Sequence, residues 1–400
     1  MMSDKKIALV TCYFQRNYGS QLQAYATQMA FDKLELTNET IRIDGLLPEI
    51  NRAKYRYFLG RVLDSATIRD KMATVRKALA RKRNVQYAHD LATRYRMFDG
   101  FARERFRLSA LYQSKAELGR NAGEYAAFVV GSDQLWLPSN IAADYYTLNF
   151  VSDCVTKIAL ATSFGVSSLP KRYGRKAGKF LSRMDYVSVR EVSGQKLVKR
   201  WANRDVPVVC DPTIMFTANE WSEALGACED GKRFADNNKY IFVYFLGNNP
   251  WEREVVKGAS TTTGLKIVQI AHCDEYVKTD VGFADFTPYD VGPKEFVELI
   301  RDAEYVFTDS FHCTVFSMLN KKKFFTFPRY NNDGAASTNG RLYSLLSLMG
   351  QEGRLIKKED VGRFDLSLEL DTNMVEAGLD RMRHSTWEWL RNALVQSNIL

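Results

Sequence analysis

The stretch YVFTDSFHCTVFSMLN, residues 305–320, decides the fold class of this 400-residue chain. A short apolar run of strand type is followed by a polar joint, TDS, and then by apolar residues at helical spacing. A strand that passes into a helix through a joint of a few residues is typical of βα units, in which parallel strands are flanked by helices. His312, one of only four histidines, lies at the start of that helix.

Strand-like and helix-like segments alternate in the same way on both sides of this stretch. The first half contains strand-like runs at 6–14, 40–44, 126–131, 157–165, 186–190 and 206–211. The second half contains such runs at 240–247, 265–272, 305–309 and 324–328. Because the chain is longer than one hydrophobic core usually supports, the alternation predicts two Rossmann-like α/β domains with a cleft between them.

The expected domains span residues 1–225 and 240–370, and the polar stretch 226–239 is expected to connect them. The first domain carries a basic helical insertion at about 52–107. A C-terminal helix within 371–400 is expected to pack back across both domains.

Composition predicts a soluble, folded, cytoplasmic protein. The chain is 46% hydrophobic and 26% charged, which is an ordinary globular balance. Its longest apolar runs are far shorter than the roughly 20 residues that cross a bilayer, and the opening MMSDKK lacks the apolar core of a signal peptide. The six cysteines are scattered, without a CxxC pair or a metal-ligand spacing, so reduced structural thiols and no metal site are expected.

The positive charge is concentrated in residues 52–107. This segment holds sixteen Lys and Arg against five Asp and Glu, a net of +11, whereas the whole chain carries +9. Aromatic residues recur in it at helical spacing, at Tyr95, Phe98, Phe101 and Phe106. We expect amphipathic helices with a basic face that is either solvated or bound to an anionic partner. No nucleic-acid motif is present, and the inner leaflet of the membrane is the sharper alternative.

Polar residues follow the strands where ligands bind in open α/β sheets, beyond the carboxyl ends of the strands. After the first strand, QRNYGSQ (15–21) places Gly19 at the start of a helix, whose free N–H groups can bind a phosphate or carboxylate. The alternative is a glycine turn capped by Asn17. The P-loop pattern GxxxxGK[ST] and the dinucleotide pattern GxGxxG are absent.

Four further post-strand positions carry ionisable side chains. Asp133, in GSDQLW, is expected to cap a turn, bind a sugar hydroxyl or act as acid or base. Arg190, in SVRE, is expected to hold a carboxylate or phosphate, or else to pair with Glu191. Asp211, in VVCDPT, is expected to be structural. His312 lies where the positive end of a helix dipole suits an anionic ligand.

Together these motifs resemble the polysaccharide pyruvyl transferase family. The matching segments are NYGSQLQAYA, VVGSDQLW, SVRE followed by SGQKL, CDPT, TDSFHCTVFSM with KKFFTFP, and NGRLYSLLSLMG, in this order. Members transfer a pyruvyl group from phosphoenolpyruvate to two hydroxyls of a sugar, forming a cyclic ketal, and have a fold similar to GT-B glycosyltransferases. The resemblance implies an enzyme of cell-surface polysaccharide synthesis with a GT-B-like arrangement, with phosphoenolpyruvate as donor substrate and no other cofactor.

The resemblance also implies roles for individual residues. His312 matches the donor-site histidine of the family and is expected to bind phosphate or donate a proton. Arg190 is expected to hold the donor's carboxylate or phosphate, and Asp133 to deprotonate or orient an acceptor hydroxyl. The acceptor is expected to be a saccharide, either a polymer or a unit linked to polyprenyl diphosphate. The residues expected to bind the donor are Asn17, Tyr18, Gly19, Ser20, Gln21, Ser132, Ser310 and Arg341.

One position departs from the family pattern. Several members have an arginine two residues before the histidine, where this chain has Ser310. Either another arginine supplies that cation, with Arg190, Arg329 and Arg341 as candidates, or the donor is different. The alternative functions are a GT-B-like glycosyltransferase that uses a nucleotide sugar and a non-catalytic saccharide-binding protein.

A few other histidine and aromatic residues are considered as site residues. His272 ends an apolar strand of the second domain and is the second histidine candidate, whereas His89 and His384 are expected to be packing or surface residues. Tyr18 and Trp136 are candidates for stacking on a sugar ring, although such rings more often lie in the core.

Overall fold

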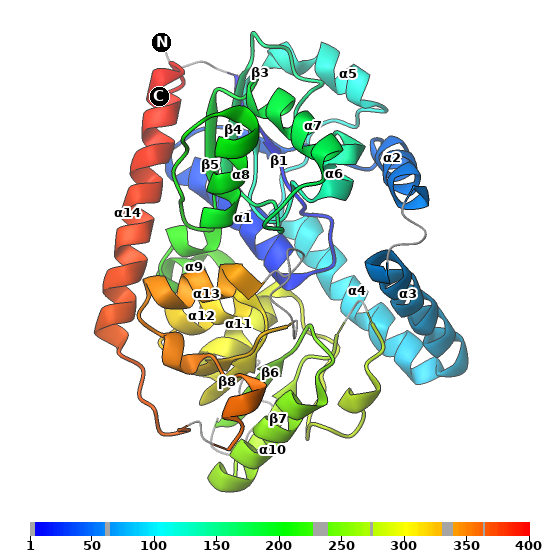
Figure 1. Ribbon diagram of the computed structural model, residues 1–400, viewed down its shortest axis with the longest axis vertical. Coiled ribbons are helices and arrows are strands. Elements are labelled where there is room, and N and C mark those ends of the chain that lie inside the picture. Colours follow the sequence, from blue (N-terminus) through cyan, green and yellow to red (C-terminus); the bar gives the residue numbers. More distant parts are fainter. Residues whose placement is uncertain (1–4, 61–64, 227–238, 273–274, 330–338, 363–364) are drawn as a thin grey trace.

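The computed structural model describes residues 5–60, 65–226, 239–272, 275–329, 339–362 and 365–400. Within these ranges the chain forms two α/β halves, each built on a wholly parallel sheet flanked by helices (Figure 1). The predicted α/β fold class is confirmed. The connection expected at 226–239 lies almost entirely outside the described residues.

The first sheet has the strand order β2-β1-β3-β4-β5. Its strands are β1 (Lys6–Val10), β2 (Asn38–Thr40), β3 (Tyr125–Val130), β4 (Thr156–Thr162) and β5 (Tyr186–Val189). The helices of this half are α1 (Tyr18–Lys33), α5 (Lys115–Arg120), α6 (Pro138–Ala143), α7 (Lys171–Leu181), α8 (Val192–Ala202) and α9 (Ala218–Leu225), with short 3-10 turns η1 (Ala122–Glu124) and η2 (Pro212–Met215).

Two predicted strands of this half are wrong in extent or type. The strand expected at 40–44 is β2, which pairs with β1 only over Asn38–Thr40. Ile41 and Ile43 are nevertheless buried, so the apolar alternation that suggested a longer strand comes from core packing. The run at 206–211 forms only an isolated bridge, Val189 to Val208, where Pro207 has no N–H to donate.

The second sheet has the order β7-β6-β8-β9. Its strands are β6 (Tyr240–Tyr244), β7 (Lys266–Gln269), β8 (Tyr305–Thr308) and β9 (Lys323–Thr326). The helices are α10 (Pro250–Thr263), α11 (Pro293–Asp302), α12 (Phe311–Leu319), α13 (Asn339–Leu348) and α14 (Thr372–Gln396), with 3-10 turns η5 (Lys278–Asp280), η6 (Glu352–Arg354) and η7 (Lys358–Asp360). All five residues of β6 are buried, as expected for a parallel strand covered on both faces.

The two halves share a continuous apolar core. Tyr18, at the start of α1, stacks on Phe296 of α11 with ring centroids 4.2 Å apart, and its hydroxyl donates to Val291 O at 2.8 Å. Arg94 bonds across the same junction, to Tyr289 O at 3.0 Å and Pro288 O at 2.6 Å. These contacts bring the carboxyl ends of the two sheets together.

The helix α14 runs along one edge of both halves (Figure 1). It returns to the first half, where Thr386 Oγ1 accepts from Cys210 N at 2.9 Å and Trp387 Nε1 donates to Met215 O at 3.1 Å. Among the described residues, no helix has both the length and the apolar character that crossing a membrane requires.

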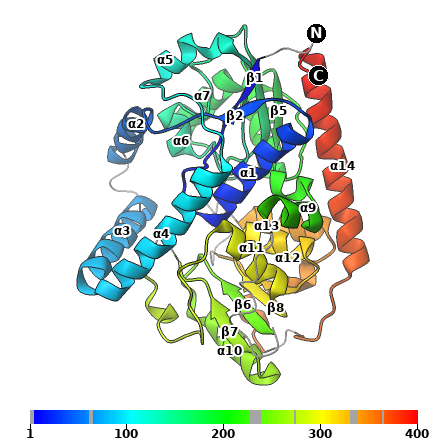
Figure 2. The same ribbon diagram turned by 180° about the vertical axis from the view of Figure 1, so that it is seen from behind.

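Three helices carry the basic segment: α2 (Leu47–Leu59), α3 (Ser65–Arg83) and α4 (Val85–Arg105). They lie along the edge of the molecule opposite α14, and α4 runs from there across the first half beside α1 (Figure 2). The bond from Gln21 Nε2 of α1 to Phe98 O of α4, at 3.3 Å, joins the two helices.

Candidate active site

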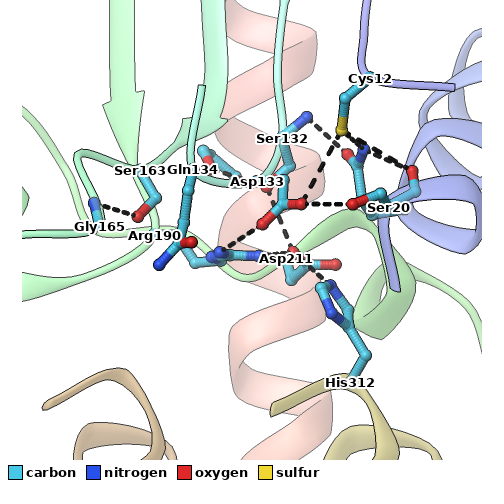
Figure 3. A network of polar contacts seen from close by, with 12 residues as sticks. Cys12, Ser20, Ser132, Asp133, Gln134, Ser163, Gly165, Arg190, Asp211 and His312 are labelled. Atoms are coloured by element: carbon cyan, nitrogen blue, oxygen red, sulfur yellow. Dashed lines mark hydrogen bonds and ion pairs between the residues drawn. The ribbon is translucent and has the colours of Figure 1, made fainter. Parts of the chain in front are cut away.

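Polar side chains from both halves meet at one place between the two sheets (Figure 3). The first half contributes Ser20 from α1, Asp133 after β3, Arg190 after β5, and Asp211 after the extended run 206–210. The second half contributes His312, in the first turn of α12. The strand order reverses between β1 and β3 and again between β6 and β8, so this is the topological switch point of both sheets, where ligands bind in open α/β folds.

The loop after β3 places the Asp133 carboxylate. Gly131 has a φ of 146°, and a Cβ there would lie 2.0 Å from Leu160 O, so only glycine fits. Asp133 itself has a φ of 71°, in the left-handed region that residues other than glycine rarely adopt outside functional turns. Its Oδ2 accepts a hydrogen bond of 2.9 Å from Ser20 Oγ.

Arg190 joins two carboxylates in the centre of the site. Its guanidinium forms a close ion pair with Asp211 Oδ2, and its Nη2 lies 3.3 Å from Asp133 Oδ1. Asp211 also accepts from Ser132 Oγ at 3.2 Å, and from Thr213 N at 3.0 Å and Oγ1 at 2.7 Å. Both oxygens of this buried carboxylate are therefore paired, which holds Arg190 in place.

His312 is placed by the first half as well as by its own helix. Its Nε2 lies 3.5 Å from Asp211 Oδ2, within ion-pair distance, yet it has no hydrogen-bond partner among the described residues. On the other side of the ring, a Cβ at Gly19 would lie 2.0 Å from His312 Nδ1. The imidazole of His312 thus approaches the backbone at Gly19 closely. Gly19 is the second residue of α1 and His312 is the second residue of α12, so the N-terminal ends of these two helices meet here.

Two arginines lie against the ring of Phe311, beside the histidine. The Arg190 and Arg341 guanidinium carbons are 4.9 Å and 5.7 Å from the ring centroid. The Nε atoms of both are buried without a hydrogen-bond partner. Arg329 is held further back, with Nη2 donating to Asp309 O at 3.3 Å. The site therefore contains more guanidinium donors than the described acceptors occupy.

The two central carboxylates are held in the charged form. Burial alone would raise the pKa of Asp133 and of Asp211. Arg190 and then His312 outweigh burial, however, so the pKa of each carboxyl lies below its usual value. Both groups therefore act as fixed negative charges at neutral pH.

For two neighbouring groups, burial is not outweighed and sets the direction of the pKa shift. It lowers the pKa of Arg341 to about 10, and repulsion from Arg190 contributes. Burial also raises the pKa of Glu191, although Arg190 opposes this. Glu191 Oε1 accepts from Ser163 Oγ at 2.9 Å, whereas its Oε2 is buried and unpartnered. Burial thus disfavours the charged form of both side chains, the guanidinium of Arg341 and the carboxylate of Glu191.

Buried polar atoms nearly always have a hydrogen-bond partner, so unpartnered ones that gather in one place indicate a ligand site. Among the described residues, five such atoms belong to His312 and to side chains of the loops and helices near it: Gln134 Nε2, Arg190 Nε, Glu191 Oε2, His312 Nε2 and Arg341 Nε. Among the described residues, no group of three or more His, Cys, Asp or Glu side chains is placed to hold a metal ion.

The structure gives several expected donor-binding residues a structural contact. Asn17 caps α1, accepting from Ser20 N at 3.1 Å, and Ser310 caps α12, accepting from Cys313 N at 3.4 Å. Gln21 is buried against α4. Tyr18 and Trp136 are fully buried, so neither ring presents a face to a sugar.

Two residues of the network were not assigned to the site from sequence. Asp211 does cap the turn that follows it, as expected, but it also faces His312 and Arg190. Its position after a strand-like run was the available signal. Cys12 Sγ lies 3.8 Å from Asp133 Oδ2, and burial raises the pKa of this thiol, which agrees with a reduced structural cysteine.

Solved structures with which this chain aligns include the wall teichoic acid polymerase TagF, at 12% identity and a TM-score of 0.43, covering 98% of this chain and 83% of that chain. The glycosyltransferase SnogD from Streptomyces nogalater aligns at 10% identity and 0.46, covering 99% of each chain. A UDP-N-acetylglucosamine 2-epimerase from Rickettsia bellii aligns at 10% and 0.45, covering 98% of each. No curated protein matches this chain in sequence.

The fold and site define a two-sheet α/β protein with a cluster of charged side chains between its halves. The family model of polysaccharide pyruvyl transferase matches residues 17–331. This chain belongs to that family, which confirms the resemblance found in the sequence motifs. Membership makes it a transferase of polysaccharide modification, with a polysaccharide as the implied acceptor.

Proposed function

We propose that the protein transfers the pyruvyl group of phosphoenolpyruvate to two hydroxyls of one sugar, forming a cyclic ketal and releasing inorganic phosphate. The observation that carries this proposal is the pair of guanidinium groups beside His312, where Arg190 and Arg341 flank Phe311, each with a buried Nε that has no hydrogen-bond partner among the described residues, and where two helices begin. Phosphoenolpyruvate brings a phosphate and a carboxylate, which guanidinium groups and helix N-termini bind well.

Arg341 is the proposed anchor of the donor. Arg190 is already paired with Asp211 and Asp133, whereas Arg341 has a buried, unpartnered Nε and a pKa lowered to about 10. Binding an anion would relieve the cost of burying that charge. Arg341 then supplies the cation that other family members carry at the position of Ser310. Arg190 fixes the positions of the Asp133 and Asp211 carboxylates relative to the donor.

The proposed reaction begins with transfer of a proton to the methylene carbon of the donor, which leaves an oxocarbenium-like centre at C2. His312, between Asp211 and the first turn of α1, is the proposed proton donor or phosphate ligand. A sugar hydroxyl attacks C2 and loses its proton, and the C2–O bond to phosphate breaks. The second hydroxyl then attacks C2 and loses its proton, which closes the ketal. One hydroxyl proton replaces the proton placed on carbon, and the other leaves with phosphate.

Asp133 is better suited to orient the acceptor than to remove its proton. Because Arg190 and His312 hold its pKa below the usual value, the carboxylate is a weak base but a strong hydrogen-bond acceptor. Ser20 Oγ fixes one of its oxygens. Glu191, whose pKa burial raises, is the nearby carboxyl better suited to exchange a proton.

The test is to incubate the purified protein with phosphoenolpyruvate and a saccharide acceptor. Phosphate release together with a new ketal methyl signal in the NMR spectrum is the expected result. Phosphoenolpyruvate alone should raise the melting temperature. Stabilisation by a UDP or GDP sugar, without any by phosphoenolpyruvate, would contradict the proposal and favour glycosyl transfer.

A further inference from the structure

The helices α2 and α3, together with the first residue of α4, expose large apolar side chains far more than a solvated surface requires. The exposed fractions are 65% for Tyr55, 50% for Leu59, 49% for Met72, 57% for Val75, 44% for Leu79 and 82% for Val85. All six lie within 31 consecutive positions, in the segment that also holds the excess positive charge. Exposed apolar side chains that cluster in this way mark an interaction surface.

On α2 these apolar side chains share one face with arginines. Arg52, Tyr55, Arg56 and Leu59 are all exposed and are spaced at i, i+3, i+4 and i+7. Residues at these intervals lie above one another on one side of a helix. The face is therefore mixed, with two cationic and two apolar side chains.

The helix α3 repeats the pattern. Met72, Val75, Arg76, Leu79 and Arg83 are exposed at i, i+3, i+4, i+7 and i+11. Residues 71–83 contain six Lys and Arg and no Asp or Glu. A cavity of about 630 Å³ borders the end of this face, lined in part by Arg76, Leu79 and Arg83.

Two basic residues of α4, Arg94 and Arg105, serve a different purpose, whereas Arg96 and Arg103 of this helix are exposed. Arg94 is fully buried and bonds to carbonyls of the second half, and Arg105 bonds to Ala224 O and Leu225 O, both at 2.9 Å. These arginines hold the fold together. The exposed cations of the basic segment are therefore concentrated on α2 and α3, which lie along one edge of the molecule, opposite α14 (Figure 1).

We propose that the exposed faces of α2 and α3 dock this protein onto an anionic phospholipid bilayer. Helices that lie in a membrane interface bury an apolar stripe while flanking Lys and Arg reach the acidic headgroups. A nucleic acid would pair with the arginines but would leave Met72, Val75 and Leu79 in water. A partner that binds only through charge would not require the apolar stripe, and a partner that binds only through apolar contacts would not require the arginines. An anionic bilayer uses both. This inference goes beyond the proposed reaction and does not depend on it.

The test measures sedimentation of the purified full-length protein with vesicles. One set contains phosphatidylcholine only, and the other contains equal parts of phosphatidylcholine and phosphatidylglycerol. The protein is expected to bind the second set and not the first, and added salt is expected to weaken binding because it screens the headgroup charge. Failure to bind the anionic vesicles would overturn the proposal.

Two pairs of variants separate the apolar from the charged contribution. Val75→Gln with Leu79→Gln keeps the charge and is expected to lower the partition coefficient at least about tenfold, whereas the control Val361→Gln with Val395→Gln should not change it. Arg76→Glu with Arg83→Glu should also lower it at least about tenfold, unlike Arg381→Glu with Arg391→Glu on α14. Equal binding by test and control variants would overturn the assignment to α3. All eight substituted side chains are largely exposed, so the fold should persist, and circular dichroism checks this.

Discussion

The loops that follow β7 and β8 each present a histidine, and the two histidines differ in how their ring nitrogens are paired. His272, after β7, has both nitrogens engaged by the backbone: Nε2 lies 2.9 Å from Leu246 O, and Nδ1 accepts from Glu275 N at 3.0 Å. His312, after β8, leaves Nε2 without a hydrogen-bond partner among the described residues, 3.5 Å from Asp211 Oδ2. One imidazole closes a loop, and the other is poised for a ligand.

The same difference in pairing separates two arginines, the fully buried Arg94 and the partly buried Arg341. Arg94 donates to Tyr289 O, Pro288 O and Ala271 O, at 3.0, 2.6 and 3.4 Å, and so joins the two halves. Arg341 keeps an unpartnered Nε and has a lowered pKa. Burial and position after a strand therefore do not distinguish a structural group from a ligand-binding one. The pairing of the polar atoms does.

The largest expected effect is the loss of transfer in His312→Gln. Removing the imidazole should lower kcat/KM by about 10²–10⁴, the usual range for a general acid or base. His272→Gln should instead lower the free energy of unfolding by about 1–2 kcal/mol through two lost hydrogen bonds, with nearly unchanged kcat/KM. Steady-state kinetics and urea denaturation of both variants test this. Equal losses of activity would break the comparison between the two loops.

Gly19→Ala should come second, because the new Cβ would lie 2.0 Å from His312 Nδ1 and would displace the ring. A shift of about 1 Å at a catalytic group can cost about 100-fold in rate. The control is Gly100→Ala in α4, where a Cβ meets no atom within 4 Å and the helix should gain about 0.5–1 kcal/mol. Kinetics at saturating donor measure the activity of both variants, and urea denaturation measures their stability. Full activity of Gly19→Ala would show that the placement of His312 is not critical.

Arg341→Met should weaken binding of phosphoenolpyruvate about 30-fold, which corresponds to about 2 kcal/mol for a charged hydrogen bond. Its free energy of unfolding should stay level or rise, since a poorly paired buried charge is removed. Arg94→Met should do the reverse, costing about 2–4 kcal/mol of stability through three lost hydrogen bonds. Isothermal titration and denaturant unfolding separate the two. Unweakened donor binding by Arg341→Met would remove Arg341 from the site.

The smallest expected effect concerns Glu252 of α10, which is fully buried; its Oε2 lies 3.7 Å from Arg253 Nη1 and has no hydrogen-bond partner among the described residues. Burial, reinforced by Asp309, raises its pKa to about 8. Native protein thus keeps a proton that the unfolded chain, with a pKa near 4.3, has lost, so stability is full at low pH and falls as pH rises toward 8. Between pH 7 and 8 the fall should be about 1 kcal/mol.

Glu252→Gln should flatten that slope, as measured by urea denaturation at pH 7 and pH 8. This result would sharpen the comparison between paired and unpaired polar groups, because a protonated carboxyl carries no charge and needs no counter-ion. An unchanged slope in the variant would mean that Glu252 is already ionised at neutral pH.

Much of the candidate site follows from sequence because each of its main residues ends a strand. Parallel strands bring their carboxyl ends to one edge of a sheet, so the strand pattern is enough to group Asp133 with Arg190 on the first sheet and to place His312 at the corresponding edge of the second. The strand pattern could not, however, exclude Tyr18 and Gln21 from the site. Both are adjacent to the site in sequence, but the helix turns their side chains into the interface with α4 and α11.

Asp211 shows why the rest could not be predicted. In sequence it is an aspartate before a proline, and a turn cap accounts for it fully. Only the packed structure shows that its second oxygen faces Arg190 and His312. Distances between residues more than 20 positions apart depend on how the two halves dock, which local patterns do not encode.

The sequence by itself determined the alternation of strands and helices, the placement of polar residues at strand ends, and the family, because these depend on periodicity and on short motifs. Only the tertiary structure decided that Gly19 receives the His312 ring, that Arg94 is paired while Arg341 Nε has no hydrogen-bond partner among the described residues, and that the pKa values of Asp133 and Glu191 move in opposite directions. Pairing and pKa depend on which charges lie within a few ångströms in a buried environment, and that is set by packing between distant segments.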